Sequence, residues 1–80
     1  MVNDFIELKD LSVSSYLYAT NLVKLVGRRK LQTGEVVFQF APKAKAEELV
    51  NLYWSLQAPP IQPKQLFSAQ RDLKDMIFGG

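Results

Sequence analysis

The chain has 80 residues, of which 48% are hydrophobic and 22% charged, a composition typical of one small folded domain spanning residues 1–80. It contains no cysteine and no histidine, which excludes disulfides, thiolate metal sites and catalysis by cysteine or histidine. Ten basic and eight acidic residues give a net charge of +2, which is only a weak indication of nucleic-acid binding. The apolar runs are shorter than the roughly 20 residues of a membrane span, and the first residues lack the pattern of a signal peptide. We therefore expect a cytoplasmic protein with no membrane partner.

The first quarter of the chain predicts a short helix. Residues 4–9 fit a strand and an irregular lead-in about equally well, so both interpretations stay open. Asp10 is expected to cap a helix over 11–20, because its carboxylate can accept hydrogen bonds from the first backbone N–H groups. Asn21 then falls where helices commonly end in the left-handed region, which asparagine tolerates well.

The centre of the chain, residues 22–41, predicts a β-hairpin, because β-branched and aromatic runs flank a polar connection. The connection is expected over 29–34, with Gly34 free to adopt a positive φ. The register that separates charged from apolar side chains pairs Lys24 with Gln39, Val26 with Val37, and Arg28 with Glu35. The other face then carries Val23, Leu25 and Gly27 against Phe40, Phe38 and Val36.

Two helices are predicted in the second half of the chain. Pro42 is expected at the first helical position of a helix that runs to about Leu56. A stiff, proline-rich connector follows, and Pro63 starts a last helix that ends near Phe78. The predicted fold class is therefore α+β, with two layers: a small antiparallel hairpin sheet, of two or three strands, packed by three helices.

The chain resembles a small family of bacterial and phage domains of unknown function over nearly its whole length. The resemblance rests on Lys9-Asp10-Leu11 with Leu17 and Ala19, Phe38-Gln39-Phe40, Leu49-Val50 with Tyr53, and Leu73-Lys74-Asp75 with Phe78. The chain has Asn21 where members of that family often have glycine. The resemblance implies this fold and a bacterial or phage origin, and it implies no active site.

The sequence offers no convincing catalytic group. Serine and threonine hydroxyls have no histidine to activate them, and no glycine-rich phosphate loop is present. Adjacent Glu47 and Glu48 diverge by about 100° on a helix, so they cannot act as a pair. Asp72 and Asp75 could share a helix face, but the neighbouring Lys74 favours a solvated surface. We expect a protein that is not an enzyme and has no metal site and no cofactor.

The first candidate site is basic. Arg28, Arg29 and Lys30 form the only run of three like charges and lie at the predicted hairpin tip, with Lys24 on the same ribbon. A two-stranded ribbon fits the DNA major groove, and arginine matches phosphates and guanine edges. The alternative is a charged tip that keeps the edge soluble. The leading hypothesis is a module that binds DNA or RNA through this tip.

A second basic pair, Lys43 and Lys45, falls in the first turn of the middle helix, where lysine opposes the helix dipole. An anion bound at that helix end would explain the residue choice. Simple tolerance of two solvated lysines is the alternative.

The competing hypothesis is a protein-interaction module, such as a small inhibitor or an assembly subunit. It would use Trp54 and a sheet edge. Because Tyr53 and Trp54 are adjacent on a helix, only one can face the core fully, and Trp54 is expected under the connector at 59–60 or exposed at an interface. Val26 and Val37 are expected to form an apolar stripe within a charged rim, across which a homodimer could form.

Overall fold

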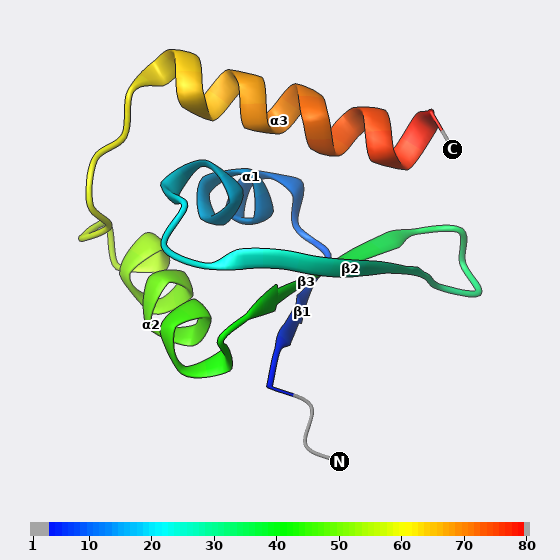
Figure 1. Cartoon of the computed structure of the whole chain (residues 1–80), viewed down its shortest axis with the longest axis horizontal. Coiled ribbons are helices and arrows are strands. Elements are labelled where there is room, and N and C mark those ends of the chain that lie inside the picture. Colours follow the sequence, from blue (N-terminus) through cyan, green and yellow to red (C-terminus); the bar gives the residue numbers. More distant parts are fainter. Residues whose placement is uncertain (1–3, 80) are drawn as a thin grey trace.

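Residues 6–8 form a strand, which decides between the two interpretations of the N-terminal segment (Figure 1). This strand pairs antiparallel with the second strand of the hairpin, so the sheet has three strands in the order β1-β3-β2. The structure, a computed structural model, describes residues 4–79. Its elements are β1 Ile6–Leu8, α1 Leu11–Thr20, β2 Lys24–Lys30, β3 Val36–Ala41, α2 Lys43–Trp54 and α3 Pro63–Phe78. The predicted α+β class is confirmed.

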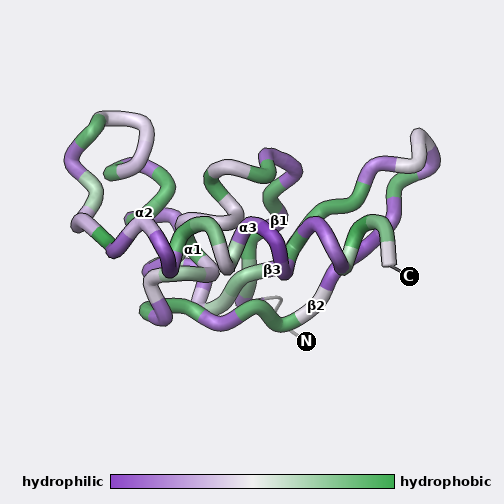
Figure 2. The backbone as a smooth tube through the Cα atoms, turned by 90° about the horizontal axis from the view of Figure 1, so that it is seen from above, coloured by the Kyte–Doolittle hydropathy of each residue, from purple (hydrophilic) through white to green (hydrophobic). Residues whose placement is uncertain are grey.

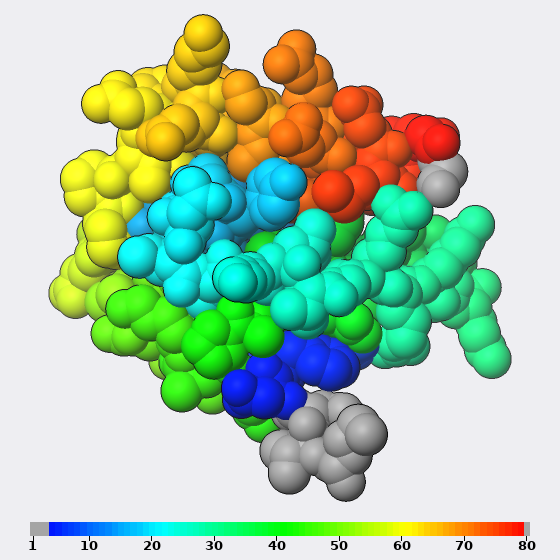
Figure 3. Space-filling view, in the orientation of Figure 1, coloured from blue at the N-terminus to red at the C-terminus, as the bar shows by residue number. Residues whose placement is uncertain are grey.

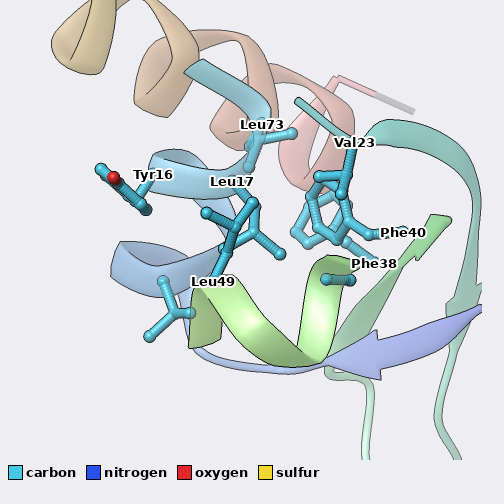
Figure 4. Close-up of a cluster of buried hydrophobic side chains, with 9 residues drawn as sticks. Tyr16, Leu17, Val23, Phe38, Phe40, Leu49 and Leu73 are labelled. Carbon is cyan, nitrogen blue, oxygen red and sulfur yellow. The ribbon is translucent and has the colours of Figure 1, made fainter. Parts of the chain in front are cut away.

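All three helices contribute to one hydrophobic core over the same face of the sheet. Figure 1 shows α1 between the sheet and α3, with α2 at one end of the sheet. The expected core residues Phe38, Phe40, Leu49 and Leu73 are buried, and half-buried Tyr53 packs against them. Figure 4 shows the four buried side chains converging with Leu17 and Val23. Within residues 4–79, no helix is long and apolar enough to cross a membrane.

Helix α1 has the predicted ends and an unexpectedly complete burial. The Asp10 carboxylate accepts hydrogen bonds from the backbone N–H groups of Ser12, at 2.8 Å, and Val13, at 3.1 Å. Asn21 ends the helix with a φ of 59°. Six of its ten residues are buried, among them Val13 and Tyr16, and the helix contacts α3 as well as α2 and β1.

The predicted hairpin register is wrong: the observed pairing lies two residues from the predicted one before Val26, and a β-bulge at Val26 adds a third. Leu25 pairs with Phe40 before the bulge, and Arg28 pairs with Phe38 after it. Directly paired residues point to the same side of a sheet, so Arg28 lies on the helix-covered face, where we expected no charge. It can do so because its long side chain reaches the edge of the layer, as described below.

The hairpin tip confirms the expected role of Gly34. Its φ is 94°, and its N–H donates to the Leu31 carbonyl at 2.9 Å. The Leu31 N–H donates to the Glu35 carbonyl at 2.7 Å, which closes a turn with a glycine in the left-handed position. Strand β2 therefore continues to Lys30, so the connection is shorter than predicted and the tip projects beyond the sheet (Figure 1).

The last two helices follow the sequence signals closely. Helix α2 starts at Lys43, one residue later than expected, with Pro42 as its N-cap after a cis peptide bond. It ends at Trp54, two residues earlier than expected. Helix α3 has the predicted bounds, and Gln62 and Gln65 form a capping box at its start. Figure 2 shows hydrophobic and hydrophilic residues alternating along α3, as expected for a helix with one buried face.

Candidate interaction surfaces

Arg29, a predicted nucleic-acid ligand, is bound within the sheet. Its Nε and Nη2 donate to the two carboxylate oxygens of Glu7 on β1, at 3.0 and 2.7 Å. The Gln39 amide on β3 also donates to Glu7, at 2.8 Å. The hydrogen bonds from Arg29 lower the pKa of Glu7 most, the hydrogen bond from Gln39 lowers it further, and the resulting pKa is about 2. Gln39 lies so close to Gly27 that a Cβ there would fall 2.5 Å from the amide oxygen.

Arg28 also has a partner within the protein, contrary to the expected pair with Glu35. Its Nη1 donates to the carbonyl of Met76 at 2.9 Å. This carbonyl belongs to the last turn of α3, where a cation is favoured by the helix dipole. Glu35 instead forms an ion pair with Lys9, at 3.7 Å. The other hairpin cations, Lys24 and Lys30, are exposed and form no ion pair among residues 4–79.

The chain's own carboxylates contact the basic pair on α2. The backbone N–H of Lys43 donates to Asp4 Oδ1 at 3.4 Å, at the helix end where an anion was expected. The Lys45 ammonium pairs with Glu48, one turn along the helix, at 3.2 Å. A carboxylate of the chain itself thus lies where an external anion was expected.

The predicted apolar stripe on the hairpin does not form. Val26 is the bulged residue and is 52% exposed, whereas Val37 is only 6% exposed. In the observed register Val37 lies opposite Arg29 and not opposite Val26. A homodimer across these two valines therefore has no continuous surface to use.

Trp54, the predicted interface residue, is exposed at the end of α2. It is 63% exposed, and its ring meets Tyr53 edge-on, with 5.2 Å between ring centroids. Of its two expected positions, the one packed under the connector is therefore wrong. Tyr16 from α1 takes that place: it is 6% exposed, and its hydroxyl donates to the Pro59 carbonyl. Burial raises the pKa of Tyr16.

Leu56 is a feature that the sequence analysis missed. It is 94% exposed and has a φ of 62°, in the left-handed region that a branched side chain rarely adopts. Its N–H donates to the Tyr53 carbonyl at 3.2 Å, and the next N–H, of Gln57, donates to Leu52 at 2.8 Å. This is a Schellman ending, in which glycine is the usual residue at the position of Leu56. The only sequence signal was the proline pair that follows.

A groove of about 570 Å³ joins these residues into one surface. All nine residues that line it are uncharged, in a chain of which 22% is charged. We call it the Trp54 surface and define it by Tyr16, Tyr53, Trp54, Leu56, Pro59 and Leu66. An adjoining hollow of about 180 Å³ adds Phe67, which is 64% exposed. The connector (yellow) and the hairpin tip (teal) lie at opposite ends of the molecule in Figure 3, so the two candidate sites are separate.

Comparisons with known proteins identify no relative. No family model, no curated protein and no solved structure matches this chain. The resemblance to a family of unknown function therefore stays a prediction. Among residues 4–79, no group of three or more acidic side chains is placed to hold a metal ion.

Proposed function

We propose that this protein is a non-enzymatic protein-interaction module, an assembly subunit that pairs with a second copy of itself through the Trp54 surface. The observation that carries the proposal is the pair Trp54 and Leu56, two large apolar side chains exposed by 63% and 94% beside an uncharged groove. Tryptophan is enriched among the residues that dominate binding energy at interfaces. Leu56 also keeps an unfavourable backbone conformation, and such strain is often retained for function.

The chemistry of the surface favours a second copy as the partner. A twofold interface brings a patch into contact with itself, so the patch must be complementary to itself. The Trp54 surface contains both protruding side chains and a groove that could receive them. Because none of its lining residues is charged, self-pairing brings no like charges together.

Nucleic-acid binding through the hairpin tip is the second candidate function. The exposed Lys24 and Lys30 support it. It is the weaker candidate because Arg29 donates its fork to Glu7 and Arg28 donates to Met76, so neither guanidinium presents its full set of donors to a phosphate.

Sedimentation equilibrium over a range of micromolar concentrations tests the proposal, together with the emission of Trp54, the single tryptophan. We expect a dimer, and a blue shift of emission as concentration rises and the indole leaves water. Leu56→Asn should remain monomeric with unshifted emission, because asparagine tolerates the left-handed conformation but is polar.

The matched control is Phe78→Asn, which removes another large apolar side chain, 83% exposed, at the far end of α3. This variant should dimerise like the parent. A monomeric parent, or a dimer that the change at Leu56 does not affect, would overturn the proposal.

A further inference from the structure

Strand β1 leaves one edge of the sheet open. Among the residues that the structure describes, it pairs only with β3, so the backbone groups that point away from β3 have no partner in that sheet. An open edge of this kind can accept an extended segment as an additional strand. The opposite edge, β2, is a poorer acceptor, because it contains the bulge at Val26 and several basic residues.

A groove of about 470 Å³ runs beside the β1 edge and is bounded by α2. Its lining residues are Ile6, Glu7 and Leu8 from the strand and Glu47, Val50 and Asn51 from the helix. Ile6 and Leu8 pair with Phe40 and Phe38, so they point toward the helix-covered face. Every second side chain of an added strand would point to that same face, toward α2.

The groove is acidic where a partner side chain would lie. Glu47 forms no ion pair among the described residues, whereas its neighbour Glu48 is paired with Lys45. No basic residue lines the groove. We propose that the β1 edge binds an extended segment of another protein, which places apolar side chains against Ile6, Leu8 and Val50 and a lysine or arginine against Glu47.

A second copy of this chain fits the edge poorly. Two β1 strands paired in full antiparallel overlap would place Glu7 directly opposite Glu7 of the other copy, and like charges in that position are destabilising. The β1 edge and the Trp54 surface share no residue. This inference therefore goes beyond the proposed self-assembly and does not depend on it.

The test uses two synthetic peptides with blocked ends, Thr-Val-Thr-Lys-Thr-Val-Thr and the same peptide with Glu in place of Lys. Both place two valines and the charged residue on one face of a strand. We expect the Lys peptide to bind the parent about fivefold more tightly than the Glu peptide, the effect of one exposed ion pair. Amide NMR signals of Ile6, Glu7 and Leu8 should shift on binding.

The variant Glu47→Lys should reverse the preference, so that the Glu peptide binds more tightly. Glu48→Lys is the matched control, because Glu48 is an exposed neighbour that does not line the groove, and it should keep the preference of the parent. Absence of binding, equal affinity for the two peptides, or shifts confined to residues outside the groove would overturn the inference. The monomeric variant Leu56→Asn should still bind the Lys peptide, so failure of self-assembly and failure of peptide binding are distinguishable.

Discussion

Arg29 and Glu7 lie on the two outer strands of the sheet, and their side chains meet across the face of the central strand. Two hydrogen bonds of 3.0 and 2.7 Å join them, and Gln39 on the central strand adds a third to the same carboxylate. The geometry is a bidentate fork, the stronger form of an arginine–carboxylate pair. Arg29, which the sequence predicts to bind nucleic acid, thus connects β1 to the hairpin.

The first prediction concerns pH. Glu7 has a pKa of about 2 in the folded protein, against 4.5 for an ordinary glutamate, so its ionised form is stabilised by folding. A lowered pKa contributes stability above pH 4.5, and this contribution is lost as the pH falls from 4.5 through about 2. The parent should therefore melt at a higher temperature than Glu7→Gln at pH 7, and the difference should shrink toward pH 2. A difference in melting temperature that does not change with pH would contradict this.

Local signals in the sequence predicted most of the fold. Asp10, Asn21, Gly34 and Pro63 each act through their own backbone position or the next turn, so their roles can be inferred without knowledge of the tertiary structure. The buried aromatic residues of β3 were also predicted, because alternation along a strand indicates one buried face.

Most of the errors came from contacts between residues distant in sequence. The bulge at Val26 adds one residue to a pairing that already lay two residues from the prediction, and a local signal for it is Gly27, a glycine inside the strand. Arg28 and Arg29 donate hydrogen bonds to residues 48 and 22 positions away in the sequence. The run of three basic residues therefore did not indicate that these two side chains bind within the protein. Trp54 is exposed, which was one of its two expected positions, but the choice between Trp54 and Tyr16 beneath the connector depended on how α1 packs.

The second prediction tests the hairpin tip against nucleic acid. Alanine at Arg28 and Arg29 would break two internal contacts, so the double change Lys24→Ala with Lys30→Ala is the cleaner test. We expect it to reduce affinity for random-sequence DNA and RNA no more than Lys64→Ala with Lys74→Ala on α3 does. For both double variants, the affinity for nucleic acid should fall steeply as the salt concentration rises, as it does where contacts to phosphates dominate. A loss of affinity specific to the hairpin lysines would favour the nucleic-acid hypothesis.

The third prediction concerns Ser14, which is fully buried in α1. Its hydroxyl has no hydrogen-bond partner within the part of the chain that the structure describes. A buried hydroxyl without a partner costs on the order of 1–3 kcal/mol, and alanine is also the better helix former. Ser14→Ala should therefore raise the free energy of unfolding by about 1 kcal/mol in urea denaturation.

Ser15→Ala is the control, and its free energy of unfolding should rise less, because the Ser15 hydroxyl already donates to the Leu11 carbonyl at 2.7 Å. Equal or lower stability of Ser14→Ala would show that this hydroxyl is satisfied in solution.

The last prediction separates stability from association at Leu56. A left-handed conformation costs a residue with a side chain roughly 1–2 kcal/mol, and glycine avoids this cost but loses about 0.5–1 kcal/mol through its more flexible unfolded chain. Leu56→Gly should therefore raise the stability of the monomer by about 0.5–1 kcal/mol. The same change removes the most exposed apolar side chain of the Trp54 surface, so dimerisation should weaken. Urea denaturation at a concentration where the parent is monomeric measures the first effect, and sedimentation equilibrium measures the second.

If Leu56 only ends helix α2 and takes no part in an interface, the variant will be more stable and will associate as the parent does. A gain in stability together with a loss of association is the result that the proposed interface requires.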